Sequence, residues 1–207
     1  MSSFVLTVRN VRALRDVRWS PEGICLLVGS NGAGKTTVLL TLRMLRAAFD
    51  HGLPRAVADH LGGIHDLKNW QAEEDDPIEI GVDIDGLSWR VQLVARGASV
   101  DYLSEESLTA GDTIVYRKDA LGNFVYRDSR LDADERLGLR AIADMKTGDD
   151  AIDRMATILR SMTVFVDPDL AGLRLRGSPS QDDRHLSTRG TNAFTMLRKW
   201  QGRREHR

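Results

Sequence analysis

The chain has 207 residues, of which 42% are hydrophobic and 29% charged, which supports a buried core and excludes extensive disorder. The formal net charge of -1 excludes a protein that coats nucleic acid through its overall charge. The single cysteine, Cys25, excludes an internal disulfide framework and a zinc site made only of cysteines. The N-terminus has no long apolar signal segment, and the apolar run Ile24–Val28 is too short to span a bilayer. We therefore expect a soluble, cytoplasmic protein without a membrane partner.

The first quarter of the chain predicts strands followed by a helix. Alternating apolar residues predict a strand at Phe4–Arg9, and a second short strand is expected at Asp16–Trp19. Ile24–Val28 is continuously apolar, which is typical of a central strand buried on both faces of a sheet. Apolar residues then recur on one helical face from Lys35 to Phe49. This order predicts a buried strand that leads through a glycine-rich loop into a helix.

The middle of the chain has the period of β-hairpins. Alternating apolar residues predict hairpins at residues 78–93 and 113–128, and Asp85–Gly86 is a strong turn signal within the first. We therefore expect residues 77–130 to form an antiparallel β-lobe.

The remainder returns to helical patterns. Helices are predicted at Asp132–Met145, Asp149–Met162 and Thr191–Gln201, and a short apolar strand at Thr163–Val166.

One motif carries recognisable chemistry. Residues 29–36 fit G-x-x-x-x-G-K-[ST], a loop whose backbone N–H groups surround a triphosphate. Glycines allow that close approach, and the following helix adds its dipole and its unpaired amides. We predict that this P-loop binds ATP through Gly29, Ser30, Asn31, Gly32, Ala33, Gly34, Lys35, Thr36 and Thr37.

Three side chains of the loop have predicted roles. Lys35 supplies a positive charge to the β- and γ-phosphates, and Thr36 offers its hydroxyl to Mg²⁺. Thr37 is placed to bond an α-phosphate oxygen.

The segments around the loop resemble a known family. FVLTVRNVRALRDVRW followed by ICLLVGSNGAGKTTVLLTLRML resembles the start of the RecF/SMC/OLD-like branch of the ABC-type ATPases, and most of all the predicted AAA-type ATPases of bacterial defence and repair loci. Val11 departs from that branch, which usually has an aromatic residue there. The segment Leu186–Leu197 resembles the L-S-x-x-G-x-N-x-x-x-x-L helix start of the same group.

The resemblance implies an α/β fold, a P-loop NTPase lobe of ABC-ATPase type, with a mixed sheet, the antiparallel β-lobe and flanking helices. Residues 1–207 would then be a single ATP-binding domain, the N-terminal part of a larger ATPase. The resemblance also implies that Arg12 lies near the bound nucleotide. A solvated arginine at a strand end is the alternative.

The remaining ABC-type motifs are not evident. Thr163–Asp167 is the one apolar run ending in an acid, so Asp167 is the Walker B candidate, but Pro168 follows where a catalytic glutamate is needed. A core strand ending in an Asp-Pro turn is the alternative. Leu186–Gly190, LSTRG, is similar to a signature motif but follows the Walker B candidate instead of preceding it. Gln181 is the Q-loop candidate or an exposed loop residue.

Other polar clusters give weaker signals. The spacing of His51, His60 and His65 is not typical of a metal site. Glu73–Asp76 is expected to be a solvated loop, with a Mg²⁺ or partner contact as the alternative. Residues 171–207 contain nine basic and three acidic residues, which fits a solvated tail or a surface for an acidic partner.

Three functions fit these observations. In the first, the chain binds ATP with Mg²⁺ and hydrolyses it when a C-terminal segment or a partner supplies Walker B and signature motifs, which drives dimerisation of two heads. That function implies a homodimer or a partner subunit across the nucleotide site, with DNA or a nuclease as a further partner. The alternatives are a small P-loop kinase and a nucleotide-gated binding module that hydrolyses little.

Overall fold

The computed structural model describes residues 4–63, 66–96, 99–132, 136–165, 168–177 and 186–204. The chain divides into two compact units, Met1–Met162 and Thr163–Arg207, which are described separately.

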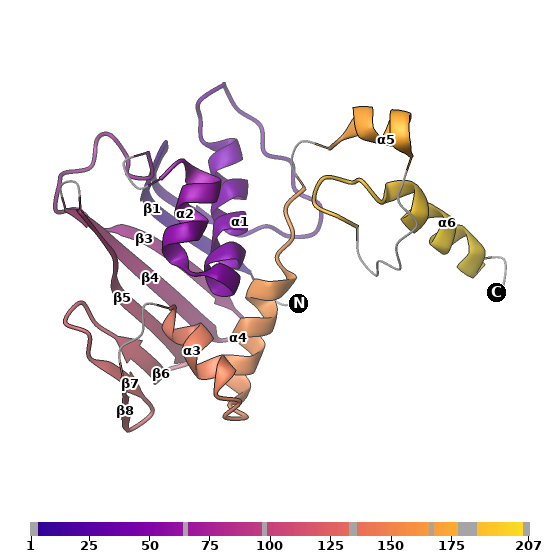
Figure 1. The fold of residues 1–207 in the computed structure, drawn as a ribbon. Helices are drawn as coiled ribbons and strands as arrows, with labels where there is room; N and C mark the ends of the chain where they lie inside the picture. The colour runs from indigo at the N-terminus through magenta and orange to yellow at the C-terminus, as the bar shows by residue number, and fades with distance from the viewer. Residues whose placement is uncertain are drawn as a thin grey trace. The chain divides into compact units, whose positions relative to one another are not determined.

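The first unit is built on one open sheet of eight strands (Figure 1). In chain order the strands are β1 (Val5–Val11), β2 (Leu14–Trp19), β3 (Ile78–Ile84), β4 (Leu87–Arg96), β5 (Ser99–Ala110), β6 (Thr113–Lys118), β7 (Phe124–Tyr126) and β8 (Ser129–Leu131). Their order in the sheet is β2-β1-β3-β4-β5-β6-β7-β8, and every neighbouring pair is antiparallel. The α/β character is confirmed, but the expected mixed sheet is wrong for the described strands.

The apolar run Ile24–Val28 is not one of the described strands of this sheet. The prediction of a buried central strand there is wrong, because the segment forms no strand and its side chains at Ile24, Leu26 and Val28 are 104%, 84% and 83% exposed. An apolar run predicts burial but does not supply a neighbouring strand. β1 already pairs with β2 on one side and β3 on the other. Figure 1 shows the chain between β2 and α1 running outside the sheet.

The predicted hairpins are confirmed. β3 and β4 pair with Ile80 opposite Val91 and Val82 opposite Trp89, which keeps the apolar side chains on one face. Asp85 and Gly86 both have positive φ, 49° and 79°, as a two-residue type I′ turn requires.

The second hairpin forms from β6 and β7 and continues into β8. β5 has no counterpart in the sequence prediction, because the polar run in SVDYLSEESLTA obscures its alternation.

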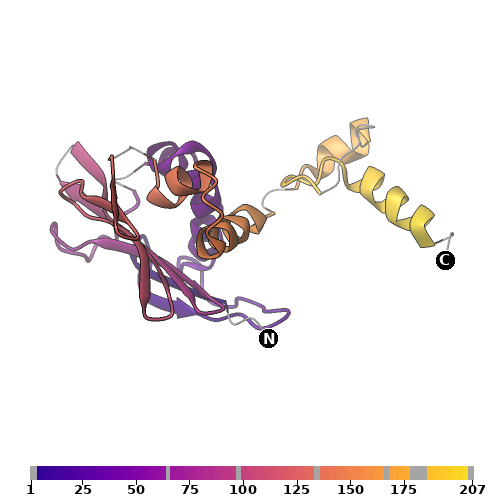
Figure 2. The same ribbon diagram turned by 90° about the horizontal axis from the view of Figure 1, so that it is seen from below.

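Four helices cover one face of the sheet (Figures 1 and 2). They are α1 (Lys35–His51), α2 (Leu53–Leu61), α3 (Gly138–Asp144) and α4 (Asp150–Ser161). α1 and α4 match the predicted helices, α3 begins later than predicted, and α2 was not predicted. The core lies between this layer and the sheet, and its fully buried large side chains include Leu6, Met44, Phe49, Ile80, Trp89 and Tyr116.

The described residues of the second unit include the helices α5 (Leu170–Arg176) and α6 (Ala193–Arg204). α6 confirms the predicted C-terminal helix, with Asn192 and Met196 buried at its start. Thr163–Phe165 forms no strand, and residue 166 lies outside the described residues. Among the residues that the structure describes, no helix is both long enough and apolar enough to cross a membrane.

Candidate functional site

The glycine-rich loop ends at the N-terminus of α1, the longest described helix. Gly34 is the N-cap residue, with φ of 89°, and supplies no side-chain cap. No described residue accepts a hydrogen bond from the backbone N–H of Gly34, Lys35, Thr36 or Thr37, and the first intrahelical bond runs from Val38 N to Gly34 O at 3.0 Å. Four amides at one helix end are therefore open to an acceptor from outside the protein, and the helix dipole favours an anion there.

Gly34 has two physical reasons to be glycine. Its left-handed φ disfavours a side chain, and an added Cβ would lie 2.4 Å from Cδ2 of Leu14. Leu14 begins β2 and is itself 3% exposed. The turn between β1 and β2 thus packs directly against the start of α1 and fixes where the loop's amides point.

Lys35 reaches back across the loop. Its Nζ donates to the carbonyl oxygens of Gly29 and Ser30, both at 2.7 Å. An ammonium group has three protons, so one remains for a further acceptor. The Thr36 hydroxyl belongs to an exposed residue beside the open amides, whereas Thr37 is 9% exposed and its carbonyl accepts from Thr41.

Arg12 lies in the turn that packs against the loop. It has φ of 48°, and its backbone N–H donates to Leu67 O at 2.8 Å while its Nε donates to Asp66 O at 3.1 Å. The side chain of Asn69 donates to the Arg12 carbonyl. The two Nη groups of Arg12 have no hydrogen-bonding partner within the described ranges. Sequence reasoning missed the segment 66–69 as the support of this arginine.

The candidates for the remaining ATPase motifs are either outside the described residues or in the second unit. Asp167 and Gln181 are outside the described residues. Leu186–Gly190 forms the turn before α6, in the second unit, where Ser187 N donates to Asn192 Oδ1 at 2.8 Å and Gly190 N donates to Ser187 O at 2.9 Å. These bonds satisfy the turn internally.

The three histidines and the acidic run Glu73–Asp76 are separate from the loop in sequence. His51 ends α1, His60 lies in α2, and His65 is outside the described residues. Burial lowers the pKa of His60 below its usual value, assisted by the charge of Arg43. Across the described segments, no group of three His, Cys, Asp or Glu residues could hold a metal ion.

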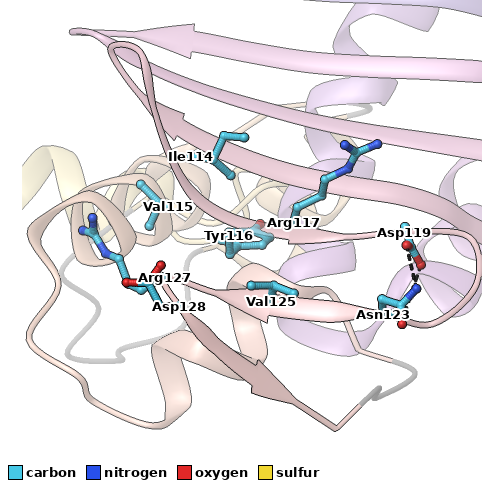
Figure 3. Close-up of a pocket in the computed structure, with 9 residues that line it drawn as sticks. All are labelled: Ile114, Val115, Tyr116, Arg117, Asp119, Asn123, Val125, Arg127 and Asp128. Carbon is cyan, nitrogen blue, oxygen red and sulfur yellow. Dashed lines mark hydrogen bonds between the residues drawn. The ribbon is translucent and has the colours of Figure 1, made fainter.

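A pocket of about 400 Å³ lies on β6 and β7, away from the loop in the sequence (Figure 3). Three of its four charged residues are already paired: Arg117 with Glu105 at 3.3 Å, Asp119 with Asn123 at 2.9 Å and Arg127 with Asp149 at 2.7 Å. It is lined by Ile114, Val115, Tyr116, Arg117, Asp119, Asn123, Val125, Arg127 and Asp128.

A buried polar network ties α3 to the sheet. The carboxylate of Glu106, 1% exposed, accepts from Trp89 Nε1 at 3.0 Å, from the Tyr116 hydroxyl at 2.6 Å and from the N–H groups of Gly138 and Leu139. Burial, together with the Glu106 charge, raises the pKa of Tyr116 well above its usual value, so its hydroxyl remains a donor. Each donor is matched to an acceptor, which marks the network as structural.

No protein-family model matches the sequence, and no curated protein matches it significantly. The functional assignment therefore depends on the loop and its surroundings.

Proposed function

We propose that the chain is the ATP-binding lobe of an ABC-type ATPase of the RecF/SMC/OLD-like branch. The single observation that carries the proposal is the start of α1, where four backbone amides have no acceptor in the described part of the chain and Lys35 reaches across the same loop. A phosphate chain supplies the acceptors that this helix end lacks. Gly34 lets the turn between β1 and β2 pack closely against the start of α1, since a larger residue would collide with Leu14.

Mg²⁺ accompanies ATP in this proposal. Thr36 fits it, because it is exposed and begins the helix next to the open amides, and its hydroxyl is the ligand that this chain would supply. When bound, the ion neutralises charge on the phosphates. Arg12 is proposed as a second cation near the nucleotide, with its Nη groups available to phosphate.

Calorimetric titration with ATP and ADP, each with Mg²⁺, tests the proposal. The folded chain should bind both nucleotides, and Lys35→Ala should weaken binding by at least about tenfold through loss of one charge-assisted contact. Lys146→Ala is the matched control, since Lys146 is exposed and lies beyond α3, and it should leave the affinity unchanged. A folded wild-type chain that binds neither nucleotide would overturn the proposal.

Hydrolysis needs groups that the loop does not contain. We propose that a C-terminal segment or partner with Walker B and signature motifs supplies them and that hydrolysis then drives dimerisation of two heads. Incubation of the chain with ATP and a panel of nucleosides separates this function from a small kinase. The antiparallel hairpins at residues 78–93 and 113–126 disfavour the kinase, because nucleotide kinases have helices in that part of the chain.

A nucleotide-gated binding module is the second candidate, favoured by α6. That helix combines exposed Phe194, Leu197 and Trp200 with four basic residues and no acidic residue. DNA binding that depends on ATP and falls steeply with salt would support it, and a flat salt dependence would exclude it.

A further inference from the structure

The turn between β1 and β2 has an unusual backbone. Arg12 and Ala13 connect the paired residues Val11 and Leu14. The φ angle is positive at Arg12, 48°, but not at Ala13, and glycine is the usual residue at the first position of such a turn. Asn10, just before the turn, also has positive φ, 57°. Backbone of this kind persists only where the surrounding structure holds it, and it clusters at ligand-binding sites.

The segment 66–69, which follows α2, holds this turn. The backbone N–H of Asn69 donates to Asn10 O at 2.9 Å, and the backbone N–H of Arg12 donates to Leu67 O at 2.8 Å. The side-chain amide of Asn69 donates to the Arg12 carbonyl. Asn69 therefore bonds two carbonyl groups at the turn, one through its main chain and one through its side chain.

The chemistry of Asn69 suits this position. Its side chain is buried, and its Oδ1 accepts from the backbone N–H of Gln71 at 2.8 Å, so both ends of the amide are bonded. An aspartate would keep the acceptor for Gln71, but it has no donor for the Arg12 carbonyl. A buried amide with both ends bonded holds its neighbours in one arrangement.

The turn holds Arg12 beside the start of α1. The Arg12 Nε donates to Asp66 O at 3.1 Å, which fixes the guanidinium and leaves its two Nη groups for another acceptor. The next two residues of the chain contact the helix start, because a Cβ added at Gly34 would lie 3.6 Å from Ala13 Cβ and 2.4 Å from Leu14 Cδ2. The guanidinium and the four open amides therefore belong to one neighbourhood.

We propose that Asn69 is a positioning residue of the nucleotide site and that it acts through Arg12. By bonding the Arg12 carbonyl, Asn69 keeps the guanidinium in place for the phosphate chain of a nucleoside triphosphate bound at the start of α1. The inference rests on the proposed function, because it assigns Asn69 a part in the same site. It extends that site to a segment that lies beyond α2 and outside the glycine-rich motif.

Titration with ATP and Mg²⁺ tests the inference. Asn69→Asp should weaken ATP binding by about fivefold or more, because Arg12 loses its donor while Gln71 keeps its acceptor. Asn69→Ser, whose hydroxyl can still accept from Gln71 but is too short for Arg12, takes its place if the aspartate variant does not fold. Gln71→Ala is the matched control, since its side chain is exposed in the same turn, and it should leave the affinity unchanged.

A double-mutant cycle separates positioning from a purely structural role. Arg12→Ala removes the guanidinium but retains the carbonyl that Asn69 bonds. On that background, Asn69→Asp should change the ATP affinity by less than about twofold, because the group that it positions is gone. An equal loss on both backgrounds would show that Asn69 does not act through Arg12 and would overturn the inference.

The titrations also distinguish failure of this inference from failure of the proposed function. A folded wild-type chain that binds no ATP overturns the proposed function and, with it, the role of Asn69. A wild-type chain that binds ATP no more tightly than folded Asn69→Asp or Asn69→Ser overturns only the role of Asn69. Circular dichroism of each variant establishes that it is folded.

Discussion

The first backbone N–H groups of α1 and of α3 both need hydrogen-bond acceptors, and the described residues supply them only at α3. Neither helix has a side-chain hydrogen bond from its N-cap residue, Gly34 in α1 and Leu137 in α3. At α3, the sheet provides the acceptor, because Glu106 takes the N–H groups of Gly138 and Leu139. At α1, the four open amides have no acceptor among the described residues.

The two helix starts differ because the amides of α3 are buried within the fold, whereas those of α1 can be reached by a ligand. The buried amides of α3 must be satisfied by the protein, since an unpaired buried donor is costly. The amides of α1 follow an exposed loop, residues 29–33, from which water or an anion can approach them, although Gly34 and Thr37 are themselves buried. α4 shows a third solution, because its N-cap Asp149 accepts from Ala151 N at 3.0 Å. An uncapped helix start that contains a lysine and follows an exposed loop is therefore a stronger indication of a binding site than a helix start that the protein caps itself.

Removing the acceptor at α3 should have the largest effect on stability. Glu106→Leu leaves the Tyr116 hydroxyl and the N–H groups of Gly138 and Leu139 without an acceptor in the core, while Trp89 Nε1 keeps the Tyr116 oxygen at 2.9 Å. The free energy of unfolding should fall by about 3–5 kcal/mol. Urea unfolding at pH 7 measures the change. A loss under about 1 kcal/mol would mean that α3 does not depend on this carboxylate, and the comparison would fail.

Gly34→Ala should disturb the start of α1, because Gly34 is its N-cap residue. The new methyl group meets both a left-handed φ and the Leu14 side chain, so we expect a loss of about 2–4 kcal/mol together with loss of ATP binding. Gly23→Ala is the matched control, because Gly23 also has positive φ, 60°, but nothing lies within 4 Å of its Cβ position. Equal losses in the two variants would show that Leu14 does not constrain the loop.

The self-capped start of α4 should respond to pH. Burial alone would raise the pKa of Asp149, but the hydrogen bonds from Arg127 and Tyr126 outweigh it and lower that pKa below its usual value. The carboxylate therefore stabilises the fold above the usual aspartate range near about 3.9, and this contribution is lost as pH falls through the lower folded-state pKa.

Asp149→Ala should cost about 1–2 kcal/mol at pH 7, because it removes the cap and the partner of Arg127. Urea unfolding from pH 7 to pH 2 should show the difference from wild type shrinking at the acid end. Asp150→Asn is the control, since the Asp150 side chain is 83% exposed, and its effect should be small throughout. A difference for Asp149→Ala that is constant with pH would exclude the charged pair as the cause.

The sequence predicted those parts of the fold whose signals are local. Alternation with Asp85–Gly86 specified the first hairpin, and the fixed spacing of the P-loop specified which residues surround the start of α1. The Glu106 network was not predictable, because its donors come from residues between 10 and 33 positions away and its partners depend on strand register. The prediction of a buried strand at Ile24–Val28 was wrong for a related reason. An apolar run indicates that a segment can be buried, but it does not indicate which neighbouring strand would bury it.

Glu105 and Glu106 are adjacent on β5, so they allow an exposed carboxylate and a buried carboxylate to be compared on the same strand. The Glu105 side chain is 41% exposed, and its ion pair with Arg117 at 3.3 Å lies on an exposed surface. Water screens such a pair, so a double-mutant cycle with Glu105→Gln and Arg117→Gln should give a coupling of about 0.5 kcal/mol or less. A coupling that approached the cost of Glu106→Leu would show that position on the strand, and not burial with matched donors, determines what a carboxylate contributes here. A small coupling would mean that burial beneath α3, where water cannot replace an acceptor, makes the carboxylate of Glu106 valuable. The start of α1 follows an exposed loop, where water can take the place of an acceptor, so the same rule explains why it can stay open.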